Sequence, residues 1–532
     1  MQYASVAFIA QCKAATNHPR AYIEVSWDGL GTFLDARAAT HWVNETRYAR
    51  SHNGRLRLSE PGEELVAPGT VGQATVVLSN DTGRFSWQNP SCPLASYIST
   101  AVGLTGKLIR IWQGFAVSGV ETGSETIEYV CIFSGVIVSW TPSTQEATVT
   151  IECRDRSYIY LQDKRNTVLV EDQRPDEWIT YLANMISLSS GEMILDPGIF
   201  AIPWCWLDDE SIAEQMWEAA RADNGSCYFD QMGTLHFESI LHWMGSPHNV
   251  VQWSFTERDY QQPDPTNAID DVATQIVAEW AAREPQTQTI IYSLDRVKVI
   301  PPGGSVTWTA RFSWPVLTIA TPVAQLINNV DNKNDHSDDI EGDYAANSSG
   351  GAILTGNITI AFTEVYAQQC KITISNSHTL FAAHLVYLQL QGIALSGRPA
   401  EQVTQDASPK PYDFERIRSV RGNVYVQTEQ QAKAFIGYLS AKHSRLRTVN
   451  TLRSVSGIPQ LEMGDRIEHQ DHRSQGVGGQ RQAFTIGIDW TATPDAGYWQ
   501  DLTVLDVDGL WEYDDYFIIG VTALGHHGRC WF

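Results

Sequence analysis

Several short strand-like segments separated by turn residues follow one another between residues 71 and 155, and this spacing restricts the fold more than any other feature of the sequence. The first strand, Gln73–Ser79, is a β-branched run, and Asn80, Asp81 and Gly83 then supply the backbone angles of a tight turn. Further strand-like segments follow at 107–112, 129–133, 136–140 and 147–153. Ser134-Gly135 is interpreted as the turn between two of them. This spacing predicts an antiparallel sandwich or barrel.

Four phrases of this stretch also have a characteristic order: "TVVLSNDTGRFSW", "GKLIRIWQGF", "CIFSGVIVSW" and "VTIECRDRS". In order and spacing they resemble the first domain of tail hub proteins of tailed bacteriophages. In that family a strand ends in Asn-Asp-x-Gly, a later strand carries Gly-Lys-x-x-Arg-Ile, and a Phe-x-Gly-x-Ile hairpin follows. The resemblance implies a barrel like that of the tail tube subunit.

Length and composition describe a folded, multidomain chain. At 532 residues the chain is too long for one core, and domains of roughly 100 to 200 residues predict three to five of them. Hydrophobic residues make up 43% and charged residues 18%, which excludes a disordered chain. The 18 tryptophans favour large β surfaces and protein interfaces.

The net charge of −24 excludes a protein that holds nucleic acid by neutralising phosphates. Two interpretations stay open: the charge keeps the chain soluble, or it lets a polyanion slide past without sticking. Acids cluster at Asp501, Asp506, Asp508, Glu512, Asp514 and Asp515, and again at 331–343. If the chain surrounds DNA, we expect some acidic surface to line the channel.

The eight cysteines show no metal-ligand spacing and are expected to be free thiols. Residues 6–10 are too short for the apolar core of a signal peptide, and no apolar run approaches the roughly 20 residues that span a bilayer. The chain is therefore expected to assemble in a cytoplasm without stable membrane insertion.

Residues 165–252 are predicted to form an α+β unit. Pro175, Asp176 and Glu177 open one helix, and a second is expected to start at Asp208 or Asp209 and to stop at Asn224-Gly225. A hairpin follows over 226–238, and its phrase "YFDQMGTLHFE" resembles the second hub domain at Phe229, Asp230, Gly233 and Leu235.

The remaining chain is predicted to be mainly β. Strands are expected at 288–292, 305–312, 357–362, 370–374 and 385–390, a turn at 301–304, and an acid-rich loop at 331–351. A helix capped by Thr428 is expected to run to His443, before a Gly464-Asp465 turn and a final strand at 517–521. Asn53-Gly54 is interpreted as a hairpin turn. The predicted domains are 1–164, 165–252, 253–422 and 423–532.

Candidate sites for chemistry are few, and the sequence predicts no catalytic, cofactor-binding or metal-binding residue. His469, Asp471 and His472 are potential metal ligands, but they stand beside turn residues, and a solvated loop is favoured; the same holds for His526-His527. A calcium loop starting at Asp331 fails, because Lys333 and His336 occupy its third and sixth places.

A glycosidase would need two acids across a sugar, with aromatic platforms nearby. Asp208-Asp209-Glu210 beside Trp204 and Trp206 offers these residue types, but a helix cap explains the acids equally well. No nucleophile elbow, phosphate-binding loop or zinc-protease motif occurs in the sequence. The chain is therefore predicted not to be an enzyme.

The resemblance covers most of the chain in pieces, including "CKITISNSHTLFAAHLVYLQLQGIALSG" and the helix and turn at 428–468. It implies a hub at the distal end of a phage tail: a homotrimeric ring that closes or extends the tail tube, lets DNA pass at ejection, and sits in the virion. Implied partners are the tail tube, distal tail, tail-tip or fibre, and tape measure proteins. The alternatives are a distal tail adaptor and, from another class, a carbohydrate-binding module or glycosidase.

Overall fold

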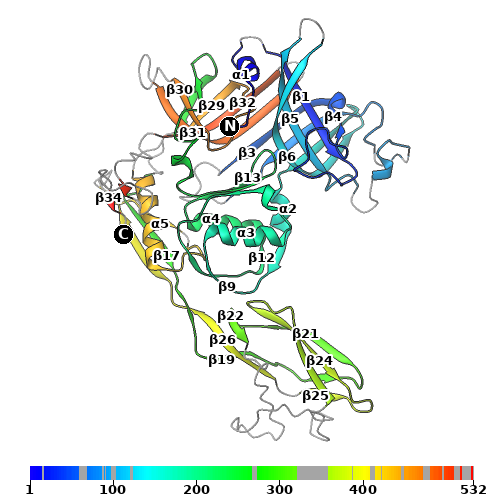
Figure 1. The fold of residues 1–532 in the computed structure, drawn as a ribbon, viewed down its shortest axis with the longest axis vertical. Coiled ribbons are helices and arrows are strands. Elements are labelled where there is room, and N and C mark those ends of the chain that lie inside the picture. The colour runs from blue at the N-terminus through cyan, green and yellow to red at the C-terminus, as the bar shows by residue number, and fades with distance from the viewer. Residues whose placement is uncertain are drawn as a thin grey trace.

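The chain forms an elongated molecule with a large β assembly at one end, helices in the middle and small sheets at the other end (Figure 1). The computed structural model describes residues 1–14, 17–58, 69–86, 89, 91–97, 103–119, 124–266, 272–319, 357–385, 388–407, 414–420, 422–444, 449–470, 480–493, 497–507, 516–517 and 529–530. The predicted fold class, mainly β with α+β parts in several units, is confirmed.

One sheet of 13 strands makes up the large β assembly. Its strands come from both ends of the chain: β1 (Pro19–Ser26), β2 (Val43–Asn44), β3 (Ala49–Arg57), β4 (Gln73–Ser79), β5 (Leu108–Ser118), β6 (Thr126–Ser143), β7 (Thr148–Arg154), β15 (Trp253–Phe255), β16 (Gln261–Thr266), β29 (Val449–Ser456), β30 (Arg466–Gln470), β31 (Gln480–Thr493) and β32 (Gly497–Asp506). Figure 1 shows the blue first strands beside the orange last strands.

The sheet consists of two halves with the same strand order. The first half runs β3-β4-β7-β6-β5, and the second runs β16-β29-β32-β31-β30, each with antiparallel neighbours throughout. The halves join where β3 pairs with β31. Strand by strand, β3 therefore corresponds to β16 and β6 to β31.

A single hydrophobic core lies behind both halves. It contains Val76, Ile111 and Phe133 from the first half and Ile467 and Leu502 from the second. Helix α1 (Val6–Lys13) closes this core, because Ser5 caps its first turn and the buried Phe8 ring meets Phe115 edge to face at 5.4 Å.

The middle of the molecule holds a second core built on four helices. They are α2 (Ser157–Gln162), α3 (Pro175–Met185), α4 (Ile212–Ala222) and α5 (Glu429–His443). Its strands are β8 (Lys164–Asn166), β9 (Val170–Gln173), β10 (Met193–Leu195), β11 (Ile202–Cys205), β12 (Asp208–Ser211), β13 (Ser226–Phe229), β14 (Leu235–Glu238), β17 (Gln275–Trp280), β27 (Glu401–Asp406) and β28 (Ile417–Val420). Trp178 of α3 and Phe435 of α5 are buried in this one core, so residues far apart in the sequence fold together.

Small sheets around a third core form the far end. The strands are β18 (Arg283–Pro285), β19 (Thr289–Ser293), β20 (Lys298–Ile300), β21 (Ser305–Arg311), β22 (Val316–Ile319), β23 (Ile358–Thr363), β24 (Gln369–Asn376), β25 (Ala383–Leu385) and β26 (Gln389–Gly397). Short 3-10 turns lie at Thr46–Tyr48, Ala95–Tyr97, Ser190–Glu192 and His242–Met244, and β33 (Tyr516–Phe517) pairs with β34 (Arg529–Cys530).

Most predicted elements are confirmed. Helix α3 begins at Pro175, and helix α5 is capped by the Thr428 side chain, which accepts from the Gln431 amide. The hairpin of β13 and β14 and the turn at Asn80 to Gly83 also form where expected. The acid-rich loop 331–351 and most of the predicted strand 517–521 lie outside the described residues.

Two predicted turns are wrong for the same reason. Ser134-Gly135 lies within β6, one strand of 18 residues, and Asn53-Gly54 lies within β3. In both places glycine serves close packing: a Cβ on Gly135 would stand 2.1 Å from the Arg154 carbonyl oxygen. Glycine inside a strand thus indicates that a neighbour approaches the backbone closely, whereas the prediction took it as the sign of a turn.

The domain boundaries 1–164, 165–252, 253–422 and 423–532 remain predictions. Strand pairing crosses them, because β15 and β16 of the third segment and β29–β32 of the fourth belong to the sheet of the first. Likewise α5 shares a core with α3 and α4. Sequence order hides such pairings, since the strands of one sheet half are separated by the whole middle and far end of the molecule.

Candidate functional site: the polar face of the joined sheet

The joined sheet presents a polar face opposite its core. Alternate residues of five strands lie on this face, as the strand registers and the burial pattern show. They are Ser51, Asn53, Arg55 and Arg57; Gln73, Thr75, Val77 and Ser79; Thr148, Thr150, Glu152 and Arg154; Asp489, Thr491 and Thr493; and Trp499, Asp501 and Thr503. Hydroxyl and amide side chains predominate in this set, and the face continues without interruption from one half to the other.

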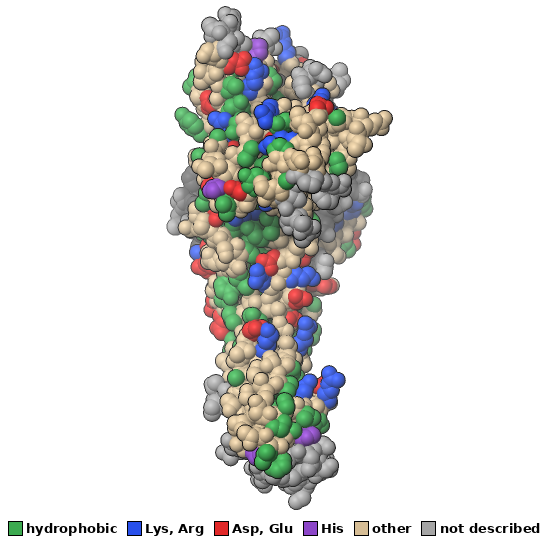
Figure 2. All heavy atoms as spheres, turned by 90° about the vertical axis from the view of Figure 1, so that its right-hand side faces the viewer, with side chains coloured by type: hydrophobic (Ala, Val, Ile, Leu, Met, Phe, Trp, Pro, Cys, Tyr) green, Lys and Arg blue, Asp and Glu red, His purple; other side chains and the backbone are tan. Residues whose placement is uncertain are grey.

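Charges on the polar face are balanced. The face has three arginines and three carboxylates, so their formal charges cancel. Arg57 pairs with Asp489 at 2.9 Å across the junction of the halves. Arg154 donates to the side-chain oxygen of Gln73 at 2.8 Å. The molecular side shown in Figure 2 likewise has basic and acidic side chains interspersed along its length. The face therefore carries no concentrated charge of either sign.

Close packing holds the junction between the halves. Gly54 of β3 pairs with Trp490 of β31, and a Cβ on Gly54 would lie 2.2 Å from an atom of the Trp490 ring. The indole also lies 6.1 Å from the Phe133 ring of the first half, centroid to centroid. Glycine is required here because the tryptophan fills the space above it.

His52 lies on the core side of the same junction, and burial lowers its pKa to about 4. Its ring nitrogens have no hydrogen-bond partner among the described residues. A histidine in the unfolded chain titrates near 6.5. The folded state therefore binds fewer protons between these values, and the free energy of unfolding is expected to fall as the pH drops from 6.5 to 4.

Between pH 7 and pH 4, His52 is expected to lower the free energy of unfolding by about 3 kcal/mol, because its pKa changes from 6.5 to about 4 and one pKa unit corresponds to about 1.4 kcal/mol. We expect His52→Leu to lack this loss. Urea unfolding of both proteins at pH 7 and pH 4 measures it. His236→Leu is the matched control with the opposite sign, since Asp230 raises the pKa of His236 against the effect of burial. Equal pH dependence in wild type and His52→Leu would contradict the expectation.

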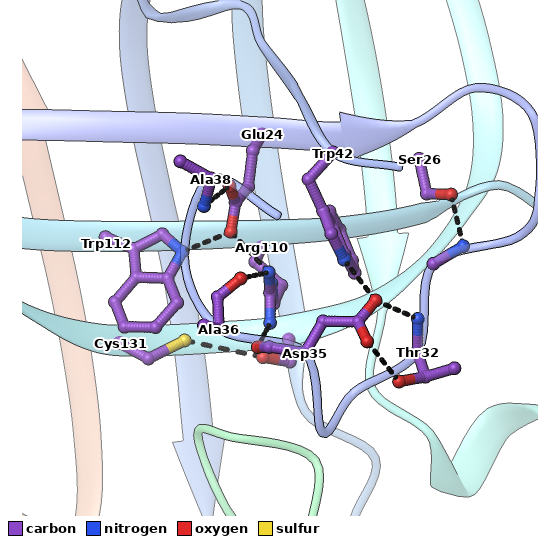
Figure 3. A network of polar contacts seen from close by, with 12 residues as sticks. Glu24, Ser26, Thr32, Asp35, Ala36, Ala38, Trp42, Arg110, Trp112 and Cys131 are labelled. Atoms are coloured by element: carbon purple, nitrogen blue, oxygen red, sulfur yellow. Dashed lines mark hydrogen bonds and ion pairs between the residues drawn. The ribbon is translucent and has the colours of Figure 1, made fainter. Parts of the chain in front are cut away.

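A buried ion pair clamps the loop 28–42 onto strands β1 and β5 (Figure 3). Arg110 and Glu24 lie 2.7 Å apart with both side chains fully buried. The guanidinium donates to the carbonyl oxygens of Asp35 and Ala36 and stacks on the Trp42 ring at 3.8 Å. Both terminal nitrogens of the guanidinium are thus engaged, while its Nε has no hydrogen-bond partner among the described residues, and these contacts hold the loop against the sheet.

The Glu24 carboxylate also accepts two neutral hydrogen bonds. The Trp112 indole and the Ala38 amide donate to it, each at 2.9 Å. Phe33 of the same loop packs under the Arg156 guanidinium, 4.7 Å from its ring centre, and against Gly233 of the β13–β14 turn. The loop therefore connects strands β1 and β5 of the large sheet with Arg156 and with the β13–β14 turn.

The acids proposed for a glycosidase lie on a strand. Asp208, Asp209 and Glu210 belong to β12, which pairs with β8, and helix α4 begins only at Ile212. Its cap is Ser211, whose hydroxyl accepts from the Glu214 amide, so the predicted helix start at Asp208 or Asp209 is wrong. A bulge at Asp209 and the apolar sequence that starts at Ile212 explain the shift.

Of the candidate metal ligands, His469 is the one within the described residues, and the predicted solvated loop is wrong for it. His469 is fully buried on β30 with its ring 3.8 Å from Asp506, while Asp471, His472, His526 and His527 lie outside the described residues, as does 331–341. Within the described ranges, no group of three His, Cys, Asp or Glu residues is arranged to hold a metal ion. The seven cysteines whose side chains the structure describes are buried free thiols, as predicted for them.

Of the acidic clusters, the structure describes Asp501 and Asp506. Asp506 is buried and pairs with Arg481 at 2.7 Å, so it does not contribute to an acidic wall. Asp501 lies on the polar face and accepts from the Ser454 amide. Asp508, Glu512, Asp514, Asp515 and the segment 331–343 lie outside the described residues, and an acidic wall stays a prediction for them.

Sequence reasoning missed the residues that hold this site together. Arg110 is the arginine of the Gly-Lys-x-x-Arg-Ile phrase, but nothing near it or near Glu24 in the sequence marks a buried ion pair. One signal was available for the junction: Trp140-Thr141 and Trp490-Thr491 occupy matching places before the turns β6–β7 and β31–β32. Among the helices of the described chain, none is long and apolar enough to cross a membrane.

Comparison with known proteins finds similarity in structure but not in sequence. No family model and no curated protein matches the chain. A tail protein from Neisseria meningitidis MC58 is similar over 92% of this chain and 98% of its own, with 8% identity and a TM-score of 0.46. A 43 kDa tail protein of prophage MuSo2 from Shewanella oneidensis is similar over 92% of this chain and 100% of its own, with 10% identity and a TM-score of 0.47.

An E. coli type VI secretion component, described as structurally similar to bacteriophage T4 tail proteins, matches over 86% of this chain and 73% of its own, with 8% identity and a TM-score of 0.35. These three similar structures are two tail proteins and one secretion component.

Proposed function

We propose that this chain is a structural hub of a phage-tail-like particle. Three copies form a ring at the distal end of the tail tube, and the polar faces of their sheets line its channel. The observation that carries the proposal is the joined sheet: two halves with the same strand order present one continuous polar face. A chain with two such halves supplies two wall segments, so three copies supply six.

The composition of the polar face suits a channel that DNA passes through. Proteins hold DNA mainly by Lys and Arg contacts to phosphates, which release bound counterions. On this face the charges cancel, and Arg57 and Arg154 are engaged by Asp489 and Gln73. Hydroxyl and amide groups keep the wall hydrated without attracting a polyanion. The proposed partners are the tail tube, distal tail, tape measure and tail-tip or fibre proteins, and the proposed location is the virion.

Native mass measurement and electron microscopy of the purified chain and of tail tips test this proposal. We expect a species of three chains with a central channel, and no glycan or peptidoglycan cleavage by the pure protein, because we assign it no catalytic role. A strictly monomeric chain that is absent from particles would reject the hub. Cleavage abolished by substituting one carboxylate, such as Glu210→Gln, would instead favour the glycosidase alternative.

A further inference from the structure

One edge of β31 is shared by two strands. Strand β30 pairs with residues 480–484, and β3 of the other half pairs with residues 487–492 of the same edge. This arrangement is the junction of the halves. It provides a template, within the chain, for how one half attaches to another.

The corresponding edge of β6 is only half used. Strand β5 pairs with β6 as far as Val136, and the main chain of Ile137 bonds to the β5 side through Lys107 and Gly106. Beyond this point, residues 138–143 have no strand on that edge among the described residues. Thr141 and Pro142 are exposed there. No described strand thus takes, beside β6, the place that β3 occupies beside β31.

Strand β16 is the counterpart of β3 and ends the sheet of the second half. It pairs with β29 on one side and with no other described strand. Gln261 on it is exposed. One chain therefore carries both members of a second junction, namely β16 at one end of its sheet and the edge of β6 in the other half. The two cannot pair within one chain, because the first junction lies between them.

We propose that β16 of one copy lies along residues 138–143 of β6 in a second copy, repeating between chains the junction that β3 and β31 make within one. This proposal rests on the proposed ring. The contact joins two different surfaces, so it propagates from copy to copy until the ring closes.

The registers of the two halves fix the expected pairs. The turn after β6 starts at Ser143, paired with Thr148, and the turn after β31 starts at Thr493, paired with Gly497. Trp140 and Thr141 therefore correspond to Trp490 and Thr491. Within the chain Asn53 pairs with Thr491. Gln261 pairs with Arg453 of β29, and Asn53 pairs with Thr75 of β4, which is at about the corresponding place in the first half. Gln261 therefore corresponds to Asn53. We expect it to lie opposite Thr141 of the second copy.

Prolines distinguish this contact from the internal one. Pro142 stands at the place of Ala492, and β16 contains Pro263 and Pro265. A proline lacks the N–H that a strand ladder needs, so it blunts a sheet edge against open-ended strand addition. The contact between copies is therefore expected to have fewer main-chain hydrogen bonds than the internal junction, which suits subunits that fold separately before they assemble.

Cysteine crosslinking of the full chain tests the pairing. Thr141→Cys and Gln261→Cys are made as separate proteins, mixed, oxidised and run on a non-reducing gel. We expect a covalent dimer in the mixture, and covalent multimers when both changes are in one chain. Asn53→Cys with Thr491→Cys is the internal control and should crosslink within a chain. Thr141→Cys mixed with Ser254→Cys, which lies on β15, should not crosslink.

The outcomes separate this inference from the proposed ring. Three chains by native mass without a Thr141–Gln261 crosslink, while the internal control crosslinks, would overturn the pairing and leave the ring standing. A monomer without the crosslink would overturn both. A crosslink with Ser254→Cys as strong as with Gln261→Cys would show non-specific contact and also overturn the pairing.

Discussion

Replacing Glu24 by glutamine is expected to lower the free energy of unfolding by about 3–5 kcal/mol, the usual cost of leaving one partner of a buried ion pair uncompensated. Arg110 is fully buried, 2.7 Å from Glu24, and its other contacts are two carbonyl oxygens and the Trp42 ring. A neutral amide cannot balance its charge, and water cannot reach it. The carboxylate also supplies the acceptors for Trp112 and Ala38, of which glutamine retains only one.

Urea unfolding followed by tryptophan fluorescence measures this loss, and limited proteolysis reports whether the loop 28–42 is released. The matched control is the exposed pair of Arg50 and Asp81, which lie 3.1 Å apart; Asp81→Asn there should cost under about 1 kcal/mol. The double variant Glu24→Gln with Arg110→Met should recover part of the loss, because the buried charge is then gone. Equal effects of Glu24→Gln and Asp81→Asn would refute the role of the clamp.

Local pattern was sufficient for the elements that local chemistry decides. The β-branched run of β4, the Asn80 to Gly83 turn and helix α5 with its Thr428 cap all follow from residues within one turn or strand. The fold class followed from their number and spacing. These predictions needed no knowledge of what the elements pack against.

Non-local contacts explain the predictions that were wrong. Gly135 and Gly54 have the composition of turns, yet a strand backbone in one case and a tryptophan ring in the other occupy the space of a side chain. Asp208 and Asp209 have the composition of a helix cap, yet pairing with β8 draws them into a strand and leaves Ser211 to cap α4. In each case a partner distant in sequence decided the structure.

The candidate site was beyond sequence reasoning for a related reason. Its polar face is assembled from strands at both ends of the chain, between which the middle and far parts of the molecule are inserted. Thr75 and Thr491 are ordinary residues of their own strands, and they share a face only because β3 lies between them. The repeated Trp-Thr pair is a trace of the two halves in the sequence.

Replacing Gly54 by valine is expected to break the junction of the halves and to cost about 3 kcal/mol or more, the upper range for overpacking a filled core. The new Cβ would stand 2.2 Å from the Trp490 ring and 2.7 Å from the Gln73 carbonyl oxygen. The ring is buried beside Phe133, and the carbonyl belongs to a strand that pairs on both sides. Relief therefore requires β3 and β31 to separate.

Thermal and urea unfolding measure the loss, and hydrogen exchange at the amides of β31 locates it. Exchange should rise over residues 487–492, which pair with β3, more than over 480–484, which pair with β30. Gly191→Ala is the control, because the nearest atom to its added Cβ is 4.0 Å away, and it should change stability by less than about 0.5 kcal/mol. The double variant Gly54→Ala with Trp490→Leu should cost less than the sum of the two single changes, since the smaller side chain vacates the space that the methyl group needs. Strict additivity of the two changes would mean that the tryptophan does not press on Gly54, and that glycine at this position is not what allows the two halves to form one wall.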